Sequence, residues 1–141
     1  MYKKIGILVV VVALLASMTI SSALACITYT PGYWKNHPED WPVDLIEIGG
    51  ITYTKSQAIR LLRTPPRGDA WIILAQKVIA AKLSMLAEPG GHWSNPANFG
   101  GINFATYVAN ANAWLASPGN RADAITYAET IDYWLNFWNV D

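Results

Sequence analysis

Four side chains of this sequence could bind a metal ion or transfer a proton, because imidazole and carboxylate groups do both. Three of them lie in the run His37-Pro38-Glu39-Asp40, and His92 is the only other histidine. The run lacks the paired histidines at helical spacing that zinc proteases use. It also fits a turn followed by a helix start, where the carboxylates would interact favourably with the helix dipole. A metal-dependent or acid–base hydrolase that uses His37, Glu39, Asp40 and His92 is therefore kept as an alternative hypothesis.

Motifs for other catalytic chemistries are missing from the chain. It has no Gly-x-Ser-x-Gly elbow, and its paired glycines lack the lysine of a phosphate-binding loop. The single cysteine, Cys26, has no evident base near it in the sequence and no second cysteine for an internal disulfide. We therefore expect a protein that is not an enzyme and that uses no cofactor.

Aromatic side chains in loops suggest recognition instead of catalysis. The chain has seven tryptophans, and the stretch from Thr28 to Pro42 sets aromatic rings among prolines, which we expect to prevent regular helix or strand there. Flat rings with hydrogen-bonding neighbours suit a sugar or the surface of another protein. The alternative is that these rings seal the open end of a small core, because tryptophan is highly buried on average. The predicted ligand-binding residues are Tyr33, Trp34, Lys35, Asn36, His37, Trp41, His92 and Trp93.

The first 25 residues have the layout of a secretory signal peptide. Lys3 and Lys4 precede an apolar run from Ile5 to Ala16, and small residues lead to Ala23-Leu24-Ala25. The apolar run is shorter than the roughly 20 residues of a membrane-spanning helix. We therefore predict a signal peptide at 1–25, cleavage after Ala25, and a single small domain at 26–141 that is secreted or attached to the cell surface.

Cleavage after Ala25 would make Cys26 the first residue of the mature chain. A lipid on Cys26, or an uncleaved signal, would be the only attachment to a membrane. The lipoprotein pattern is poorly matched, because such signals usually carry Leu three residues before the cysteine and this chain has Ala23 there.

The charge of the mature chain argues against nucleic acid as a partner. Removing residues 1–25 takes away two of the ten basic residues and none of the ten acidic ones, which leaves a net charge of −2. A chain with that balance has no overall basic field to attract a phosphate backbone.

The hydrophobic pattern predicts a mainly α domain with about four helices and a small β-hairpin. The hairpin lies within 45–54, around Gly49-Gly50, which permits a tight turn. A capping box of Thr54 and Gln57 should start the first helix, and Asp69 should cap the second. Asp69 also ends an Arg67-Gly68-Asp69 tripeptide, an integrin-binding signature, but the capping role is the more common use of such an aspartate. The expected helices are Lys55–Arg63, Ala70–Ala87, Phe104–Ala116 and Arg121–Trp138, the third and fourth capped by Asn103 and Asn120.

The helix Ala70–Ala87 is the most apolar and is expected at the centre of the domain. Its inward side should carry Trp71, Leu74, Ala75, Val78, Ile79, Leu83 and Leu86. Its solvent-exposed side should carry Gln76, Lys77, Ser84 and Glu88. The stretch at 29–42 should cover one end of the helices as an aromatic and proline-rich capping segment, and the loop at 92–101 is long enough to be functional.

The start of the mature chain resembles a module of secreted and surface-attached proteins of bacteria and archaea. The resemblance rests on Cys26-Ile27-Thr28-Tyr29-Thr30 followed by Gly32-Tyr33-Trp34-Lys35-Asn36-His37-Pro38. The runs Gly49 to Lys55 and Thr64 to Asp69 are similar to the same module, in which Gln often stands where this chain has Pro31. The resemblance covers about the first half of the mature chain, and it implies an extracellular, non-enzymatic role.

The leading hypothesis is therefore a secreted or surface-exposed interaction module that binds an extracellular glycan or protein surface through its loop aromatics. Besides the hydrolase, a second alternative is a structural surface protein that self-associates through the aromatic rings of its last helix.

Overall fold

The computed structural model describes residues 29–88 and 101–137. They form a mainly helical domain with a two-stranded antiparallel hairpin, which confirms the predicted fold class. The elements are α2 (Pro31–Asn36), the short 3-10 helix η1 (Pro38–Asp40), β1 (Leu45–Ile48), β2 (Ile51–Thr54), α3 (Lys55–Arg63), α4 (Ala70–Ala87), α5 (Phe104–Ala116) and α6 (Arg121–Phe137). The predicted signal peptide 1–25, Cys26, His92 and Trp93 lie outside the described residues.

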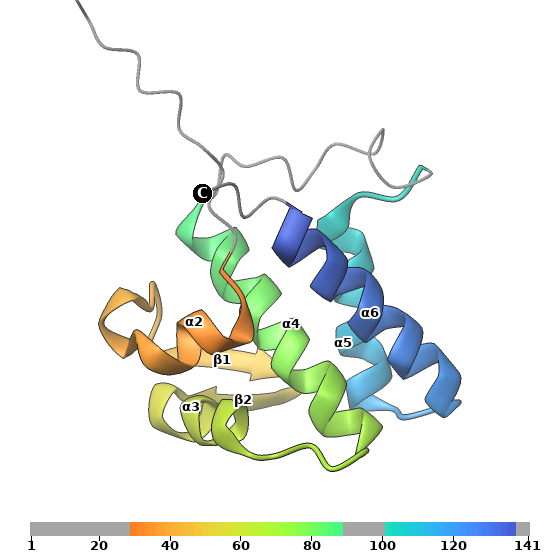
Figure 1. Cartoon of the computed structure of the whole chain (residues 1–141), viewed down its shortest axis with the longest axis horizontal. Coiled ribbons are helices and arrows are strands. Elements are labelled where there is room, and N and C mark those ends of the chain that lie inside the picture. The colour runs from red at the N-terminus through yellow and green to blue at the C-terminus, as the bar shows by residue number, and fades with distance from the viewer. Residues whose placement is uncertain (1–28, 89–100, 138–141) are drawn as a thin grey trace, which may run out of the picture.

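Helix α4 forms the centre of the domain, as its composition predicts. In Figure 1, α5 and α6 lie on one side of α4, and α2 and α3 lie on the other, while the hairpin turn reaches across to α5. Of the described helices, only α4 is long and apolar enough to cross a membrane, with a mean hydropathy of 1.5 over 18 residues. Its contacts on both sides explain that composition, because a helix surrounded by other elements must be apolar nearly all round.

The side chains of α4 depart from the predicted pattern at two positions. Ser84 was expected on the solvent-exposed side but is fully buried, because α2 packs over it. Leu86 was expected in the core but is 49% exposed near the end of the helix. The buried face also includes Ala80 and Ala81, whose small side chains let neighbouring elements approach closely.

Helices α5 and α6 pack on each other and on α4 through stripes at helical spacing. Each starts at the predicted cap: Asn103 Oδ1 accepts from the Thr106 amide at 2.7 Å, and Asn120 Oδ1 accepts from the Ala122 amide at 2.9 Å. Their buried residues are Phe104, Val108, Ala111 and Leu115 on α5, and Ala124, Ala128, Ile131 and Leu135 on α6.

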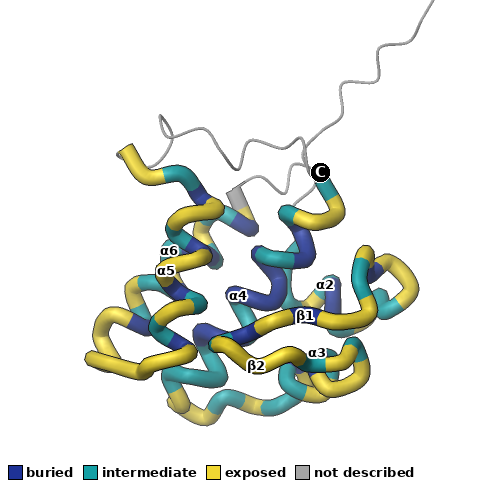
Figure 2. Tube along the Cα trace, turned by 180° about the vertical axis from the view of Figure 1, so that it is seen from behind, coloured by how far each residue is buried: buried dark blue, intermediate teal, exposed yellow. Residues whose placement is uncertain are grey.

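The hairpin leads directly into α3. Its strands pair in the register Leu45↔Thr54 to Ile48↔Ile51, and Gly49 and Gly50 form the turn with φ of 59° and 82°. Both parts of the capping box are present, because Thr54 Oγ1 accepts from the Gln57 amide and Gln57 Oε1 accepts from the Thr54 amide. One face of the hairpin is buried on the helices, while β2 lies mostly exposed in Figure 2.

The stretch expected to lack regular structure contains a helix, so that expectation was wrong. Helix α2 has Pro31 in its first turn and Thr30 as its N-cap. Proline is compatible with the first turn of a helix, because the amide it lacks has no partner there in any case. Pro38 starts η1 in the same way, with Glu39 and Asp40 in that turn. Prolines in this stretch thus begin helices and do not exclude them.

Candidate functional site

The α2–η1 segment, residues 29–41, holds most of the predicted ligand-binding residues. Helix α2 is held at its start by Thr30 Oγ1, which accepts from the Tyr33 amide at 3.4 Å. At its end, the His37 amide donates to the Tyr33 carbonyl at 3.0 Å, and the Asp40 amide continues the chain of bonds by donating to the His37 carbonyl at 3.1 Å. Local hydrogen bonds therefore fix the backbone through both short helices.

Two tryptophans bind this segment to the core. Trp34 is fully buried and Trp41 is 8% exposed, and the Trp41 indole N–H donates to the Trp34 carbonyl at 2.8 Å. Their rings meet edge to face at 6.5 Å. The prediction that Trp34 and Trp41 contact a ligand is therefore wrong, because neither ring presents a face to the solvent. Trp34 and Trp41 instead fit the alternative hypothesis, in which tryptophan rings close the end of the core.

Ser84 of α4 is the hydrogen-bonding partner of the buried end of this segment. Its Oγ lies 3.3 Å from the Trp34 indole nitrogen and 3.2 Å from the Tyr29 amide nitrogen, both of which are donors. The Ser84 hydroxyl itself donates to the Ala80 carbonyl at 2.8 Å, within its own helix. A buried indole N–H needs such an acceptor, which explains the polar side chain at the heart of an apolar helix.

Three rings form a column on the outer side of Trp34. Tyr29 stacks on Tyr33 at 3.8 Å between centroids, and His37 stacks on the opposite face of Tyr33 at 4.1 Å. All three are partly exposed. Tyr29 was not among the predicted site residues; it lies just before Thr30, the N-cap of α2, and its ring reaches Tyr33 from outside the helix.

The hydroxyl of Tyr33 donates a hydrogen bond to Asp40 Oδ2 across the surface of the segment. This bond to the carboxylate raises the pKa of the Tyr33 phenol, because it favours the protonated donor. Tyr33 is therefore held as a neutral donor in a fixed orientation, and Asp40 has one oxygen occupied. The pair joins α2 to η1.

The residues of the hydrolase hypothesis are not arranged as a metal site in the part of the chain that is described. Within residues 29–88 and 101–137 no three His, Cys, Asp or Glu side chains form a group that could hold a metal ion. The His37 ring already lies against Tyr33, with its Nδ1 2.9 Å from the Tyr33 carbonyl. Glu39 is exposed in η1, and His92 is outside the described residues.

The polar side chains around the ring column differ in charge. Lys35 is partly exposed, while Asn36, Glu39 and Asp40 are exposed. Neither described ion pair of the domain involves them. Of the predicted residues, the segment thus leaves Tyr33, Lys35, Asn36 and His37 partly or fully exposed, and it buries Trp34 and Trp41.

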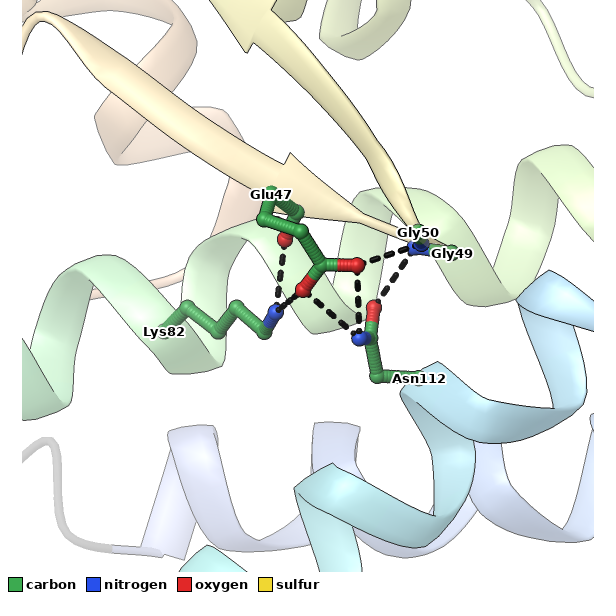
Figure 3. Close-up of polar contacts among 5 residues, drawn as sticks. All are labelled: Glu47, Gly49, Gly50, Lys82 and Asn112. Atoms are coloured by element: carbon green, nitrogen blue, oxygen red, sulfur yellow. Dashed lines mark hydrogen bonds and ion pairs between the residues drawn. The ribbon is translucent and has the colours of Figure 1, made fainter.

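A second polar cluster lies where the hairpin meets α4 and α5, and no pattern in the sequence indicated it. Lys82 Nζ donates to the Glu47 carbonyl at 2.6 Å and to Glu47 Oε2 at 2.8 Å (Figure 3). Asn112 donates its amide hydrogens to the Glu47 carboxylate at 2.9 Å and accepts from the Gly49 amide at 2.8 Å. The Lys82 ammonium above all lowers the pKa of Glu47. The polar groups that Figure 3 shows are hydrogen-bonded to one another within the cluster. We therefore assign the cluster a structural role.

The rings expected to mediate self-association mostly face inward. Trp134 lies 6.4 Å from Phe104, and Tyr127 lies 5.2 Å from Tyr107, both as centroid distances between α6 and α5. Tyr133 is 60% exposed. Among the side chains of α6 that the structure describes, Tyr127 and Trp134 therefore help to join it to α5.

Comparisons with known proteins give no further guide to the site. No protein-family model, no curated protein and no solved structure matches this chain.

Proposed function

We propose that this protein is an extracellular interaction module that binds the surface of another exported protein through the α2–η1 segment. The observation that supports this best is that the segment has buried tryptophans and exposed polar and aromatic side chains next to each other. Trp34 and Trp41 fix it to the core, while Tyr33, Lys35, Asn36 and His37 remain partly or fully exposed. A surface fixed before binding loses little conformational freedom when a partner arrives.

The ring column favours a protein partner over a sugar at this segment. Sugar recognition by stacking needs an open ring face, and both faces of Tyr33 are covered, by Tyr29 and by His37. The segment also carries one cation, one amide and two carboxylates at partly or fully exposed positions. Protein interfaces use such mixtures, with aromatic anchors near the centre and charged groups at the rim.

Export is the part of the proposal that rests on the amino-terminal sequence. The expected signal ends at Ala25, before the first described residue, Tyr29. An intact mass corresponding to residues 26–141 in the exported protein would support it, and a mass including residues 1–25 would contradict it. Additional mass from a lipid on Cys26 would indicate attachment to the membrane.

The binding proposal is tested by a double substitution at partly or fully exposed positions of α2. We expect Lys35→Glu with Asn36→Ala to remove capture of proteins from envelope and secreted fractions, while thermal unfolding stays close to that of the wild type. The matched control is Lys55→Glu with Asn110→Ala, which makes the same chemical changes on α3 and α5. Lys55 is partly exposed and Asn110 exposed, as Lys35 and Asn36 are.

Equal capture by both variants and the wild type would overturn the proposal. Equal loss in both variants would also do so, because it would show a general effect of charge. Stoichiometric zinc in the purified full chain would favour the hydrolase alternative instead.

A further inference from the structure

Basic residues gather on the stretch that runs from the hairpin turn through α3. Residues 49–68 contain no aspartate or glutamate, although the mature chain is net acidic. The same stretch contains Lys55, Arg60, Arg63 and Arg67. A local positive field on an otherwise acidic domain attracts anions to one side of it.

Helix α3 turns two of these cations outward. Ala58 and Leu62 are buried, while Arg60 and Arg63 are exposed and lie as i, i+3 neighbours. Within residues 29–88 and 101–137, neither guanidinium forms an ion pair, whereas Lys77 and Lys82 are paired with Asp132 and Glu47. The charge of α3 is thus available to an external ligand.

A shallow depression lies between β2 and α3 beside Arg60. Its volume is about 300 Å³, and it is lined by Tyr53, Gln57, Arg60, Leu61 and Thr64. The Gln57 Oε1 is occupied by the Thr54 amide at 2.9 Å, which leaves the Gln57 amide nitrogen as a donor. The Thr64 hydroxyl donates to the Arg60 carbonyl at 2.8 Å and keeps its oxygen as an acceptor. The depression therefore combines an aromatic ring, a cation, a donor and an acceptor.

We infer that this depression binds a uronic acid unit of an acidic polysaccharide. The C–H face of the sugar ring would lie against Tyr53 and Leu61, which are both partly buried and apolar in part. The Arg60 guanidinium would bind the carboxylate through paired hydrogen bonds, for which its planar shape is suited. Gln57 and Thr64 would bind the hydroxyl groups. A volume near 300 Å³ is at the low end for small-molecule sites, which fits a single sugar unit of a chain. This site is separate from the α2–η1 segment, and the inference does not depend on the proposed function.

An anionic membrane fits this surface less well. Helices that lie on membranes bury an apolar face in the lipid and keep their basic residues at the headgroups. The apolar face of α3 is buried in the domain through Ala58 and Leu62, and its outward positions are polar. The depression beside Arg60 is lined by the Tyr53 ring, so it suits a ligand unit that can enter it better than a flat membrane surface.

The test is calorimetric titration of the full mature chain with an oligogalacturonate and with its fully methyl-esterified form. We expect binding of the acidic form, weakening with added salt, and no binding of the ester. Arg60→Gln should weaken binding roughly tenfold, as expected for loss of a hydrogen bond between charged groups. The matched control is Arg63→Gln, which removes the same charge from the same helix outside the depression, and it should weaken binding far less.

A second variant tests the ring itself. Tyr53→Leu should weaken binding while the thermal unfolding midpoint shows that the domain is folded. Equal effects of Arg60→Gln and Arg63→Gln would overturn the inference in favour of a diffuse basic surface. Absence of binding to the oligogalacturonate would overturn it too, and so would binding only to vesicles with anionic lipids, which would assign the surface to a membrane.

Discussion

Ser84 shows how one hydroxyl group decides where the α2–η1 segment lies. Its Oγ is the acceptor for the Trp34 indole and for the Tyr29 amide, at 3.3 and 3.2 Å. We predict that Ser84→Ala lowers the free energy of unfolding by about 1 to 3 kcal/mol, because the buried donors lose their acceptor. Urea unfolding measures this. Ser56→Ala, at an exposed serine of α3, should change stability by less than about 0.5 kcal/mol, and an equal effect of the two substitutions would contradict the role assigned to Ser84.

Gly49 and Gly50 occupy the same turn but have different neighbours. Both have positive φ, and alanine there costs about 1 to 2 kcal/mol from backbone strain alone. A Cβ on Gly49 would lie 3.0 Å from the Leu115 backbone, whereas a Cβ on Gly50 would meet nothing nearer than 4.0 Å. We therefore predict that Gly49→Ala destabilises the domain more than Gly50→Ala in chemical unfolding. A larger loss from Gly50→Ala would show that the hairpin does not pack closely on α5.

At the scale of elements, the Glu47 cluster joins β1 to α4 and α5, and it should make stability depend on pH. The folded-state pKa of Glu47 is lowered, mainly by Lys82, from its ordinary value of 4.5. Ionised Glu47 therefore stabilises the fold above that value, and the contribution is lost as the pH falls through the folded-state pKa. The effect should be modest, because the side chain of Glu47 is 44% exposed and water screens the pair.

The prediction is that Glu47→Gln is less stable than the wild type at neutral pH and that the gap narrows as the pH falls below 4.5. Unfolding free energies across that range measure it. Lys82→Met should likewise make the free energy of unfolding depend less on pH in acid, because the Lys82 hydrogen bond is the main cause of the lowered pKa of Glu47. A gap that is constant or that widens in acid would show that Glu47 is not stabilised by its charge.

The longer elements were predictable because each carries its own local signals. The bounds of α3, α4 and α5 are those expected from the sequence, and α6 starts at the expected Arg121 and is described as far as Phe137, while the expected last residue, Trp138, lies outside the described residues. The capping box at Thr54 and the caps at Asp69, Asn103 and Asn120 all form as predicted. Asp69 Oδ1 accepts from the Trp71 and Ile72 amides, which gives the last residue of the Arg-Gly-Asp tripeptide its capping role.

The candidate site was harder to predict because its residues look alike in sequence. Trp34 is buried and Tyr33 is partly exposed, although they are adjacent. Which of them faces the core depends on the rotation of α2 about its axis, and the prolines concealed that helix. The burial of Ser84 follows from the packing of α2 on α4, and the Glu47 cluster joins residues far apart in the chain. Periodicity within one element carries no information about such tertiary contacts.

At the scale of the whole molecule, the two proposed binding surfaces lie on the same half of the domain. Figure 1 shows α2 and α3 together on one side of α4, with α5 and α6 on the other. The half formed by α5 and α6 contributes buried stripes and ring pairs to the core. We therefore expect substitutions that alter binding to cluster in residues 29–64, and those on α5 and α6 to act mainly through stability.

The central claim is that the α2–η1 segment is fixed to the core before any partner binds. Hydrogen exchange of the Trp34 and Trp41 indole N–H groups, followed by NMR in the isolated mature chain, tests it most directly, because these groups donate to Ser84 Oγ and to the Trp34 carbonyl. We predict that both indole groups exchange as slowly as the backbone amides of Ile79 and Leu83 in α4, through global unfolding. Exchange of either group at the rate of an unstructured peptide, while α4 remains protected, would contradict the claim.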